Sequence, residues 1–352
     1  MQFKKIKLKD IADINMRQSP SGSSYNNNGR GIPFLQGNKT FGFLYPIIDT
    51  WTTEPKKIGK KNSVLMSVRA PVGDLNIANK DICIGRGLCS IEMKNGNNQY
   101  LYYLLKNSIK KIKMKSTGTV FDSINRKELE NIEILDFNKL QQKKISKVLF
   151  DIDKKIELNI QTNDNLYEII KTQYDKFIND IDEYELVKLK DIVNVSSGKR
   201  PKIKGNEFDI PLIGASGVMA YTDNYNFNED ILIIGRVGTL GVVQRYFHKI
   251  WASDNTLTIK TEYSSAVECY LKTVDYISLN RGSTQPLIIQ NDISNLKMKF
   301  NKVKFEEFEK EIRPLRDKIY KNELQNKTLE QLRDTLLPEL MNGEIDLDKI
   351  KI

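Results

Sequence analysis

The chain has few residues of the kinds that build disulfides, metal sites and histidine-based catalysis. Its 352 residues include three cysteines, with no Cys-x-x-Cys pair, and one histidine, His248. An odd number of cysteines without a spacing pattern is typical of free thiols in a reducing compartment. A zinc site made of clustered histidines and most acid–base schemes that use histidine are excluded.

Long hydrophobic runs are also missing. The run ILII at 231–234 is among the longest, and a helix needs about 20 apolar residues to span a bilayer. The first ten residues, MQFKKIKLKD, have no apolar core after their lysines, so we expect no secretory signal peptide. We therefore expect a cytoplasmic protein without a membrane segment.

Sequence patterns for nucleotide binding and catalysis are incomplete or absent. SSGKRP, from Ser196, lacks the upstream glycine of an ATP-binding P-loop, and IGRGL, from Ile84, lacks the third glycine and the helix of a dinucleotide loop. No Pro-Pro dipeptide occurs, so the loop with which amino-methyltransferases hold a flipped base is missing. Acidic pairs such as Glu306–Glu307 fit a solvated helix face better than a nuclease site. We predict no catalytic residue, no metal site and no cofactor bound by this chain.

What the sequence does have is enough apolar residues for two domains, and an excess of positive charge. Hydrophobic residues make up 39% of the chain, and 55 Lys and Arg against 45 Asp and Glu give a net charge of +10. The length suits two compact domains. The charge favours a polyanionic partner, because each basic group near a phosphate releases a counterion. A lysine-rich solvated surface is the alternative explanation.

The sequence is an internal repeat. KLKDI occurs at 7–11 and again at 188–192, and later segments recur in the same order. IPFLQG from Ile32 matches IPLIGA from Ile210, and VLMSVRAPVG from Val64 matches ILIIGRVGTLG from Ile231, which aligns Arg69 with Arg236. STGTVFDSINRKELENIEI from Ser116 matches GSTQPLIIQNDISNLKM from Gly282. Two diverged copies, the second with shorter loops, explain this conserved order.

Each copy reads as a mixed α+β domain followed by a long helix. Short β-branched runs broken by Gly, Pro and Asn predict strands joined by turns. Apolar residues at three- and four-residue spacing predict one helix over 97–113, NNQYLYYLLKNSIKKIK, and one over 264–280, SSAVECYLKTVDYISLN. The predicted division is two recognition domains, 1–138 and 183–303, each followed by a coiled-coil segment, 139–182 and 304–352.

The two long segments share a heptad seam in which each residue of the second lies 163 positions after its counterpart. The seam of the first helix is Ile145, Leu149, Ile152, Ile156, Asn159, Asn163, Leu166, Ile170, Gln173 and Phe177. The seam of the second helix is Phe308, Ile312, Leu315, Ile319, Asn322, Asn326, Leu329, Arg333, Leu336 and Leu340. At Arg333 we expect the neighbouring Leu332 to supply the apolar surface, as Ile169 does in the first helix. We expect Pro338 to end the second helix and Pro314 to kink it.

Two asparagines interrupt each seam at matching places. If the helices pair in opposite directions, Asn159 faces Asn326 and Asn163 faces Asn322. A polar residue in an apolar seam weakens pairing but fixes register, since a one-heptad slip would bury its amide against Leu or Ile. Ordinary exposed turns are the alternative reading. A paired stretch of about 33 residues predicts a rod of roughly 50 Å, which suits two readers of a split DNA site, because successive major grooves repeat about every 34–36 Å.

The remaining candidates for a functional role are basic and amide side chains at repeated places in the sequence. Arginine pairs with guanine, Asn and Gln with adenine, and hydroxyl groups with phosphate. For any one of these residues, a surface cation or a turn is the simpler interpretation; as a set they predict DNA contacts. The candidates are Lys39, Arg69, Arg86, Thr117, Thr119, Arg126, Lys199, Arg200, Arg236, Arg281, Thr284 and Gln285.

This arrangement resembles the specificity subunit of type I restriction–modification systems. The KLKDI openings, GSTQPLI from Gly282 and LLPELMNGEI from Leu336 are similar to that family's sequences, and the resemblance covers essentially the whole chain. STGTVFDSI in the first copy differs from the corresponding GSTQP segment of the second copy.

The resemblance implies a non-catalytic subunit that reads a split, asymmetric target in double-stranded DNA, one half per recognition domain. It implies an antiparallel coiled coil that docks two modification (methyltransferase) subunits using S-adenosylmethionine to methylate adenine. It also implies restriction subunits that use ATP and Mg for translocation and cleavage.

Two alternatives belong to other classes. One is the recognition part of a split methyltransferase–nuclease enzyme, and the other is a coiled-coil scaffold protein with incidental basic charge. The missing catalytic loops count against activity in this chain. The salt dependence of duplex binding separates a DNA reader from a scaffold.

Overall fold

The computed structural model describes residues 4–16, 18–116, 123–205 and 207–349. Packing divides the chain into two units, Met1–Gln161 with Glu323–Ile352 (unit 1) and Thr162–Asn322 (unit 2). Two long helices, α4 (Lys139–Asn179) and α7 (Lys302–Met341), each contribute one half to each unit. None of the helices in the described ranges is long and apolar enough to cross a membrane.

Unit 1 contains a strand-rich domain with one main helix. Its elements are β1 (Lys5–Lys7), α1 (Leu8–Ile11), β2 (Ala12–Met16), η1 (Gly22–Ser24), β3 (Tyr25–Asn26), β4 (Ile32–Leu35), η2 (Asn38–Thr40), β5 (Trp51–Thr52), β6 (Ile58–Gly59), β7 (Val64–Ser67), β8 (Leu75–Ile77), β9 (Ile82–Ile84), β10 (Leu88–Met93), α2 (Asn98–Ser116), α3 (Arg126–Glu130), β11 (Glu133–Leu135) and η4 (Leu347–Lys349). The helix predicted over 97–113 is confirmed as α2.

Unit 2 repeats the same plan with fewer strands. Its elements are β12 (Glu185–Lys188), η3 (Leu189–Asp191), β13 (Asn194–Ser197), β14 (Ile210–Gly214), β15 (Gly217–Thr222), β16 (Ile231–Gly235), β17 (Val243–Tyr246), β18 (Trp251–Ala252), β19 (Thr256–Lys260), α5 (Ser264–Leu271), α6 (Gln290–Ser294) and β20 (Lys297–Phe300). This mixed α+β content agrees with the predicted fold class.

The sheet topology shows that the repeat extends to strand pairing. The four-stranded sheet has the order β2-β10-β7-β8 in unit 1 and β13-β19-β16-β17 in unit 2, and β1–β11 corresponds to β12–β20. A second sheet has five strands in unit 1, β3-β5-β4-β9-β6, and three in unit 2, β15-β14-β18. Each second sheet contains one parallel pair, β4–β9 or β14–β18.

The repeated KLKDI segment closes each domain by the same contacts. Leu8 and Leu189 are fully buried, and their amides donate to the carbonyl oxygens of Ile132 (2.9 Å) and Leu296 (2.8 Å). The aspartate two residues later caps the turn, because its carboxylate accepts from the amide of the lysine three residues before it. The first strand thereby pairs with the last strand of its own domain.

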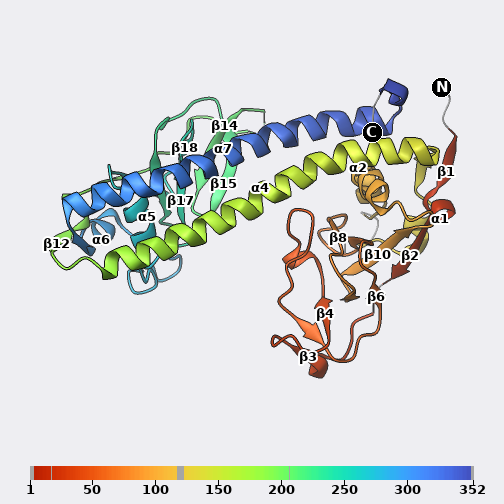
Figure 1. The fold of residues 1–352 in the computed structure, drawn as a ribbon, viewed down its shortest axis with the longest axis horizontal. Helices are drawn as coiled ribbons and strands as arrows, with labels where there is room; N and C mark the ends of the chain where they lie inside the picture. Colours follow the sequence, from red (N-terminus) through yellow and green to blue (C-terminus); the bar gives the residue numbers. More distant parts are fainter. Residues whose placement is uncertain (1–3, 17, 117–122, 206, 350–352) are drawn as a thin grey trace. The chain divides into compact units, whose positions relative to one another are not determined.

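The two long helices pair in opposite directions within each unit and form part of its core (Figure 1). All twenty predicted seam residues are buried or half-buried. In unit 1 the core includes Ile145, Leu149 and Leu340 together with α2, and in unit 2 it includes Ile170, Phe308 and Ile312 together with α5. The helix halves therefore pack on the domain as well as on each other.

Two local expectations are wrong. Leu332 and Ile169 are each 46% exposed, and Arg333 itself is buried because its Nη1 pairs with the buried Asp153 Oδ1 at 2.7 Å. Pro338 does not end α7, since its carbonyl still accepts from Asn342 N (2.8 Å). The helix ends at Met341, before Gly343 with φ 73°. The helix is continuous through Pro314, and a kink there stays a prediction.

The helix predicted over 264–280 stops at Leu271. The chain turns back there, because the Tyr276 hydroxyl donates to the Leu271 carbonyl (2.8 Å) and the Asp275 carboxylate accepts from Ile277 N (3.0 Å). Asp, Thr and Ser favour such side-chain-capped turns over helix interiors.

Candidate nucleic-acid interface

The aligned arginines lie at the ends of matching buried strands. Arg69 follows β7 and forms an isolated bridge with Ser123, and Arg236 follows β16, next to the bridge between Val237 and Leu287. Ile124 N donates to Val68 O (3.1 Å), and Ile288 N donates to Arg236 O (2.9 Å). A late loop of each domain therefore returns alongside the strand that carries the arginine.

In unit 2 this late loop is the GSTQPLI segment, and it brings three predicted residues to one place. Gly238 N donates to Pro286 O (2.9 Å), and a Cβ atom at Gly238 would lie 3.7 Å from Gln285 Nε2. Thr284 and Gln285 are exposed beside the strand end that carries Arg236. In unit 1 the predicted Thr117 and Thr119 lie outside the described residues.

Arg236 is held by its neighbours. Its Nη1 donates to Ser197 Oγ (3.2 Å), its amide donates to Asn255 O (3.0 Å), and its Nε is buried without a hydrogen-bond partner in the described part of the chain. The half-buried guanidinium is thus tied to β13, and the backbone of Arg236 is tied to the turn that contains Asn255.

Arg281 and Arg126 are engaged in ion pairs within their own domains. Arg281 binds Asp292 through Nε (2.9 Å to both oxygens) and Nη2 (2.5 Å), and this hydrogen bonding lowers the pKa of Asp292. Arg126 Nε lies 2.7 Å from Glu130 Oε1 on α3. Arg281 therefore fastens its loop to α6, and a DNA role for either arginine stays a prediction.

Four other predicted cations are exposed on loops or short turns. Lys39 lies in η2, and Arg86 follows β9, where its amide donates to Ser19 Oγ (3.0 Å). Lys199 and Arg200 follow β13; the Lys199 carbonyl accepts from Trp251 Nε1 (2.6 Å), which fixes the backbone there. All four side chains face solvent.

Arg200 lines a hollow in unit 2 that we term the basic hollow. Its walls are Arg200, Pro201, Lys202, Lys204, Leu212, Met219, Ser253, Asp254 and Asn255. Ser253 is 2% exposed and its Oγ has no hydrogen-bond partner among the described residues. Three cations and one carboxylate surround a buried hydroxyl group, which suits an anionic ligand that also carries hydrogen-bonding groups.

Sequence reasoning missed the five polar residues that line the basic hollow with Arg200, namely Lys202, Lys204, Ser253, Asp254 and Asn255. Lys202 and Lys204 belong to the basic run KRPKIK at 199–204, which could have identified them. The segment Ser253–Asn255 gives no signal by itself, because only the folded chain brings it beside that run.

The asparagine pairs face each other as the sequence predicts. In unit 1, Asn159 Nδ2 donates to Asn326 Oδ1 (2.7 Å) and to Gln325 Oε1 (2.9 Å). In unit 2, Asn322 Nδ2 donates to Asn163 Oδ1 (2.7 Å), and Asn163 Nδ2 donates to Ile319 O (3.4 Å). The opposite direction of the helices is confirmed; the role of these residues in register remains a prediction.

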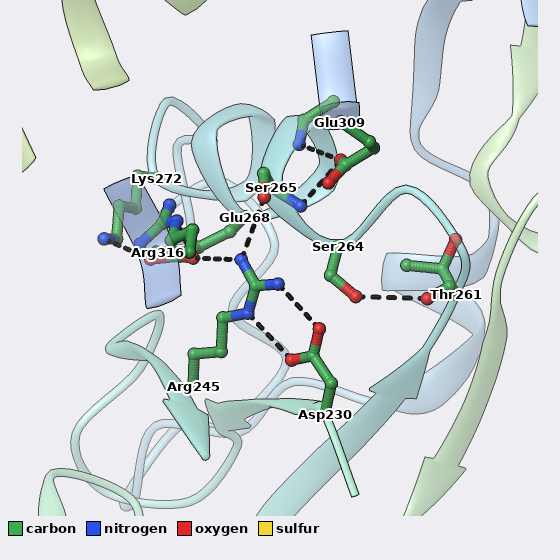
Figure 2. Close-up of polar contacts among 10 residues, drawn as sticks. Asp230, Arg245, Thr261, Ser264, Ser265, Glu268, Lys272, Glu309 and Arg316 are labelled. Atoms are coloured by element: carbon green, nitrogen blue, oxygen red, sulfur yellow. Dashed lines mark hydrogen bonds and ion pairs between the residues drawn. The ribbon is translucent and has the colours of Figure 1, made fainter. Parts of the chain in front are cut away.

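A buried charge network fastens α5 to α7 in unit 2 (Figure 2). Glu268 on α5 binds Arg316 of α7 (2.8 Å), Lys272 (2.7 Å) and Arg245 of β17 (3.4 Å), and Arg245 also forms a bidentate pair with Asp230 (2.6 and 2.8 Å). Burial opposes ionisation of Glu268, but these three cations outweigh it and lower its pKa. The network orders the domain rather than forming an exposed site.

Glu309 of α7 binds the start of α5 in the same network. Its Oε1 accepts from Ser265 N (2.8 Å) and Ala266 N (2.9 Å), as Figure 2 shows. Burial raises the pKa of Glu309 in spite of these bonds. Across the described ranges, no cluster of three or more His, Cys, Asp or Glu residues could hold a metal ion.

Comparisons with known proteins identify the class. A family model described as the type I restriction modification DNA specificity domain matches residues 2–168 and 181–333, which places one match over each copy of the repeat. The chain belongs to this family. It is a type I restriction–modification specificity subunit with two tandem recognition domains.

Relatives of this chain include proteins named as specificity subunits. The MjaIX specificity subunit of a type I restriction enzyme from Methanocaldococcus jannaschii is 24% identical and covers 98% of this chain and 94% of its own length. The MjaX specificity subunit of the same organism is 44% identical over 41% of this chain and 35% of its own length. A crystal structure of a type I restriction–modification S subunit from M. genitalium has the same fold, with a TM-score of 0.67, 18% identity, and coverage of 97% and 96% of the two chains.

Proposed function

We propose that this chain reads a split target in double-stranded DNA, with one half of the target read by each unit. The observation that carries the proposal is the matching placement of Arg69 and Arg236 after the equivalent strands β7 and β16, with the exposed Arg86 and Arg200 on other loops of the two units. Basic groups fixed on short turns suit phosphate and base-edge contacts. The net charge of +10 favours the same partner.

The chain itself supplies recognition and no chemistry in this proposal. Two modification subunits bring S-adenosylmethionine and methylate adenine, and restriction subunits bring ATP and Mg for translocation and cleavage. The family membership supports these partners, and it supports a cytoplasmic location, where duplex DNA is accessible and the buried free thiols of Cys83, Cys89 and Cys269 stay reduced.

Exposed apolar residues on the long helices support docking of two equivalent partners. Ile169 in unit 2 and Leu332 in unit 1 are each 46% exposed, and they are 163 residues apart, as are the exposed Leu140 and Val303. Each unit therefore presents two exposed apolar side chains at equivalent positions of the long helices. We propose that one modification subunit covers each pair.

Mapping of methylated adenines tests the function directly. The chain is co-expressed with the modification subunit of its own system, and modified adenines are mapped across the host genome. We expect one asymmetric target made of two short read segments with a constant unread gap. An uninterrupted target, or modification that is independent of this chain, contradicts the proposal.

Two assays address the alternatives. The chain alone, incubated with labelled methyl donor and mixed-sequence duplex, is expected to transfer no methyl group, whereas a split enzyme would do so. Duplex binding is expected to weaken steeply between low and moderate salt, by roughly tenfold or more for each few phosphates contacted. Duplex binding that does not change with salt concentration would favour the alternative of a coiled-coil scaffold protein.

A further inference from the structure

One turn in each unit occupies the same place in the repeat. In unit 1 the turn Gly85–Leu88 joins β9 to β10, and in unit 2 the turn Ser253–Thr256 joins β18 to β19. The amide of the first residue of each turn donates to a carbonyl of the strand that pairs in parallel with the strand before the turn. Gly85 N donates to Leu35 O (2.8 Å) and Ser253 N donates to Ile213 O (3.0 Å). The turns are therefore equivalent in position and register.

The remaining hydrogen bonds of the two turns also match. The fourth residue donates back to the first, with Leu88 N to Gly85 O at 3.2 Å and Thr256 N to Ser253 O at 3.0 Å. The carbonyl of the third residue of each turn accepts from the residue that follows β7 or β16. Val68 N donates to Gly87 O (2.8 Å), and Arg236 N donates to Asn255 O (3.0 Å). Both turns thus have fixed backbones that are tied to two sheets.

Close backbone approach explains the glycines beside these turns. A Cβ atom at Gly85 would lie 2.7 Å from Gln36 Cα, and one at Gly198 would lie 2.0 Å from Ser253 O. In unit 1 the turn itself supplies the glycine, and in unit 2 the neighbouring strand supplies it. The second position of each turn needs no glycine and faces solvent, which frees it to carry a variable side chain.

That second position carries opposite charges in the two units. It is Arg86 in unit 1 and Asp254 in unit 2, and both side chains are exposed. Asp254 belongs to the wall of the basic hollow, and its carboxylate has no hydrogen-bond or ion-pair partner within the described residues. A carboxylate at a DNA-binding surface is repelled by phosphates, so its favourable partner there is a hydrogen-bond donor on a base.

We propose that this position selects a base in each half of the target. Arg86 donates to the paired acceptors of a guanine, and Asp254 accepts from the exocyclic amino group of a cytosine or adenine in the major groove. Arg200, Lys202 and Lys204 hold the adjacent phosphates and place the Asp254 carboxylate at the base edge. Ser253 Oγ, buried without a partner at the same wall, provides a further hydrogen-bonding group. This inference rests on the proposed reading of split DNA.

Selection from a random duplex library tests the assignment. The full chain, co-purified with the modification subunit, is allowed to select DNA, and enriched bases are compared for the wild type and the variants Asp254→Ala, Asp254→Arg and Arg86→Ala. We expect Asp254→Ala to lose preference for an amino-bearing base at one position of one half, by about 5- to 150-fold. Asp254→Arg should prefer guanine there, and Arg86→Ala should lose a guanine preference in the other half only.

Two controls separate base reading from general electrostatics. Asp175→Ala removes one exposed negative charge from α4 of the same unit and is expected to leave the selected sequence unchanged. Lys202→Ala is expected to weaken binding to all sequences alike and to reduce the salt slope by about one. An Asp254→Ala profile equal to that of the wild type, or altered in both halves, overturns the assignment. A wild-type complex that selects no sequence would instead contradict the proposed function.

Discussion

Asp153 of unit 1 and Glu268 of unit 2 are buried carboxylates that each pair with an arginine of α7. Asp153 accepts from Arg333 (2.7 Å) and from the Tyr103 hydroxyl (2.8 Å), and Glu268 accepts from Arg316 (2.8 Å). Removal of one partner of a buried pair leaves an uncompensated charge, whereas replacement of both by apolar groups is often neutral. The Glu268 pair therefore fastens α5 to α7, and the Asp153 pair fastens α4 to α7, without contributing large net stability.

The acids of the unit 2 network are expected to respond oppositely to amide substitution. Glu268→Gln removes the carboxylate that pairs with Arg316 and Arg245, and it should lower the free energy of unfolding by about 3–5 kcal/mol. Glu309→Gln keeps an oxygen acceptor for Ser265 N and Ala266 N and removes a buried charge, so stability at neutral pH should stay equal or rise. Urea titration of both variants checks this pair, and equal losses would contradict it.

The pH dependence of stability follows from the pKa directions. The lowered pKa of Glu268 gives a contribution that is complete above its ordinary value of 4.5 and is lost as pH falls through the folded pKa. The raised pKa of Glu309 has the opposite sign, since stability falls as pH rises from 4.5 through its folded pKa. Thermal melts from pH 4 to pH 8 should show the melting temperature of Glu309→Gln rising relative to that of the wild type as pH rises. A difference that stays constant with pH would contradict this.

The unit 1 pair offers a double-mutant test. Asp153→Leu alone should destabilise the chain by about 3–5 kcal/mol, because Arg333 then keeps only the exposed Asp334 as an ion-pair partner and the Tyr103 hydroxyl loses its acceptor. Addition of Arg333→Met should recover most of that loss by filling the seam with apolar atoms. Denaturant unfolding of the two single variants and the double variant measures the coupling, and additive losses would contradict a paired role.

At the level of elements, we predict that the asparagine layers hold α4 and α7 in one register. Each layer joins two amides at 2.7 Å within an otherwise apolar seam. Replacement of Asn159, Asn163, Asn322 and Asn326 by Leu should raise the melting temperature while allowing alternative registers. Spin-label distance distributions across α4 and α7 should broaden in the variant, and a single unchanged distance would contradict the register role.

The C-terminal end of α7 depends on a glycine rather than on a proline. Gly343 has φ 73°, a conformation that costs an L-residue about 1 kcal/mol, so Gly343→Ala should lower stability by about that amount. Pro338→Ala should not lengthen the helix, because Gly343 still ends it. Hydrogen exchange of residues 339–345 measures both outcomes, and extra protection beyond Gly343 in Pro338→Ala would contradict this account.

At the level of the whole molecule, each recognition domain is closed by its own strands. The first pair, β1–β11, joins residues 5–7 to 133–135, so this strand pair is complete before α4 begins, and we predict that the segment 1–138 can be exchanged as one recognition domain. Exchange of this segment for that of a related specificity subunit should change one half of the methylated target and leave the other half and the helix-bound partners unaltered. A change in both halves would contradict independent readers.

The candidate interface could be predicted only where the repeat provided a second copy. Arg69 and Arg236 were identified because two copies of a strand aligned, and the structure places both beside a returning loop. Arg281 looked equally promising in sequence, yet it binds Asp292, eleven positions later, because α6 folds back onto its loop. Asp254 gave no signal, since its environment of Arg200, Lys202 and Lys204 comes from a segment about fifty residues earlier.

The sequence by itself determined the repeat, the two α+β domains, the heptad seam and the facing asparagines, because periodicity and spacing act along the chain. Only the tertiary structure decided three other features. Arg333 is buried in the seam because it pairs with Asp153, and α7 continues past Pro338. The turn between β18 and β19 lies beside the basic run that follows β13. These outcomes depend on charge pairing and burial between segments distant in sequence, and local patterns do not encode which partner a buried group will find.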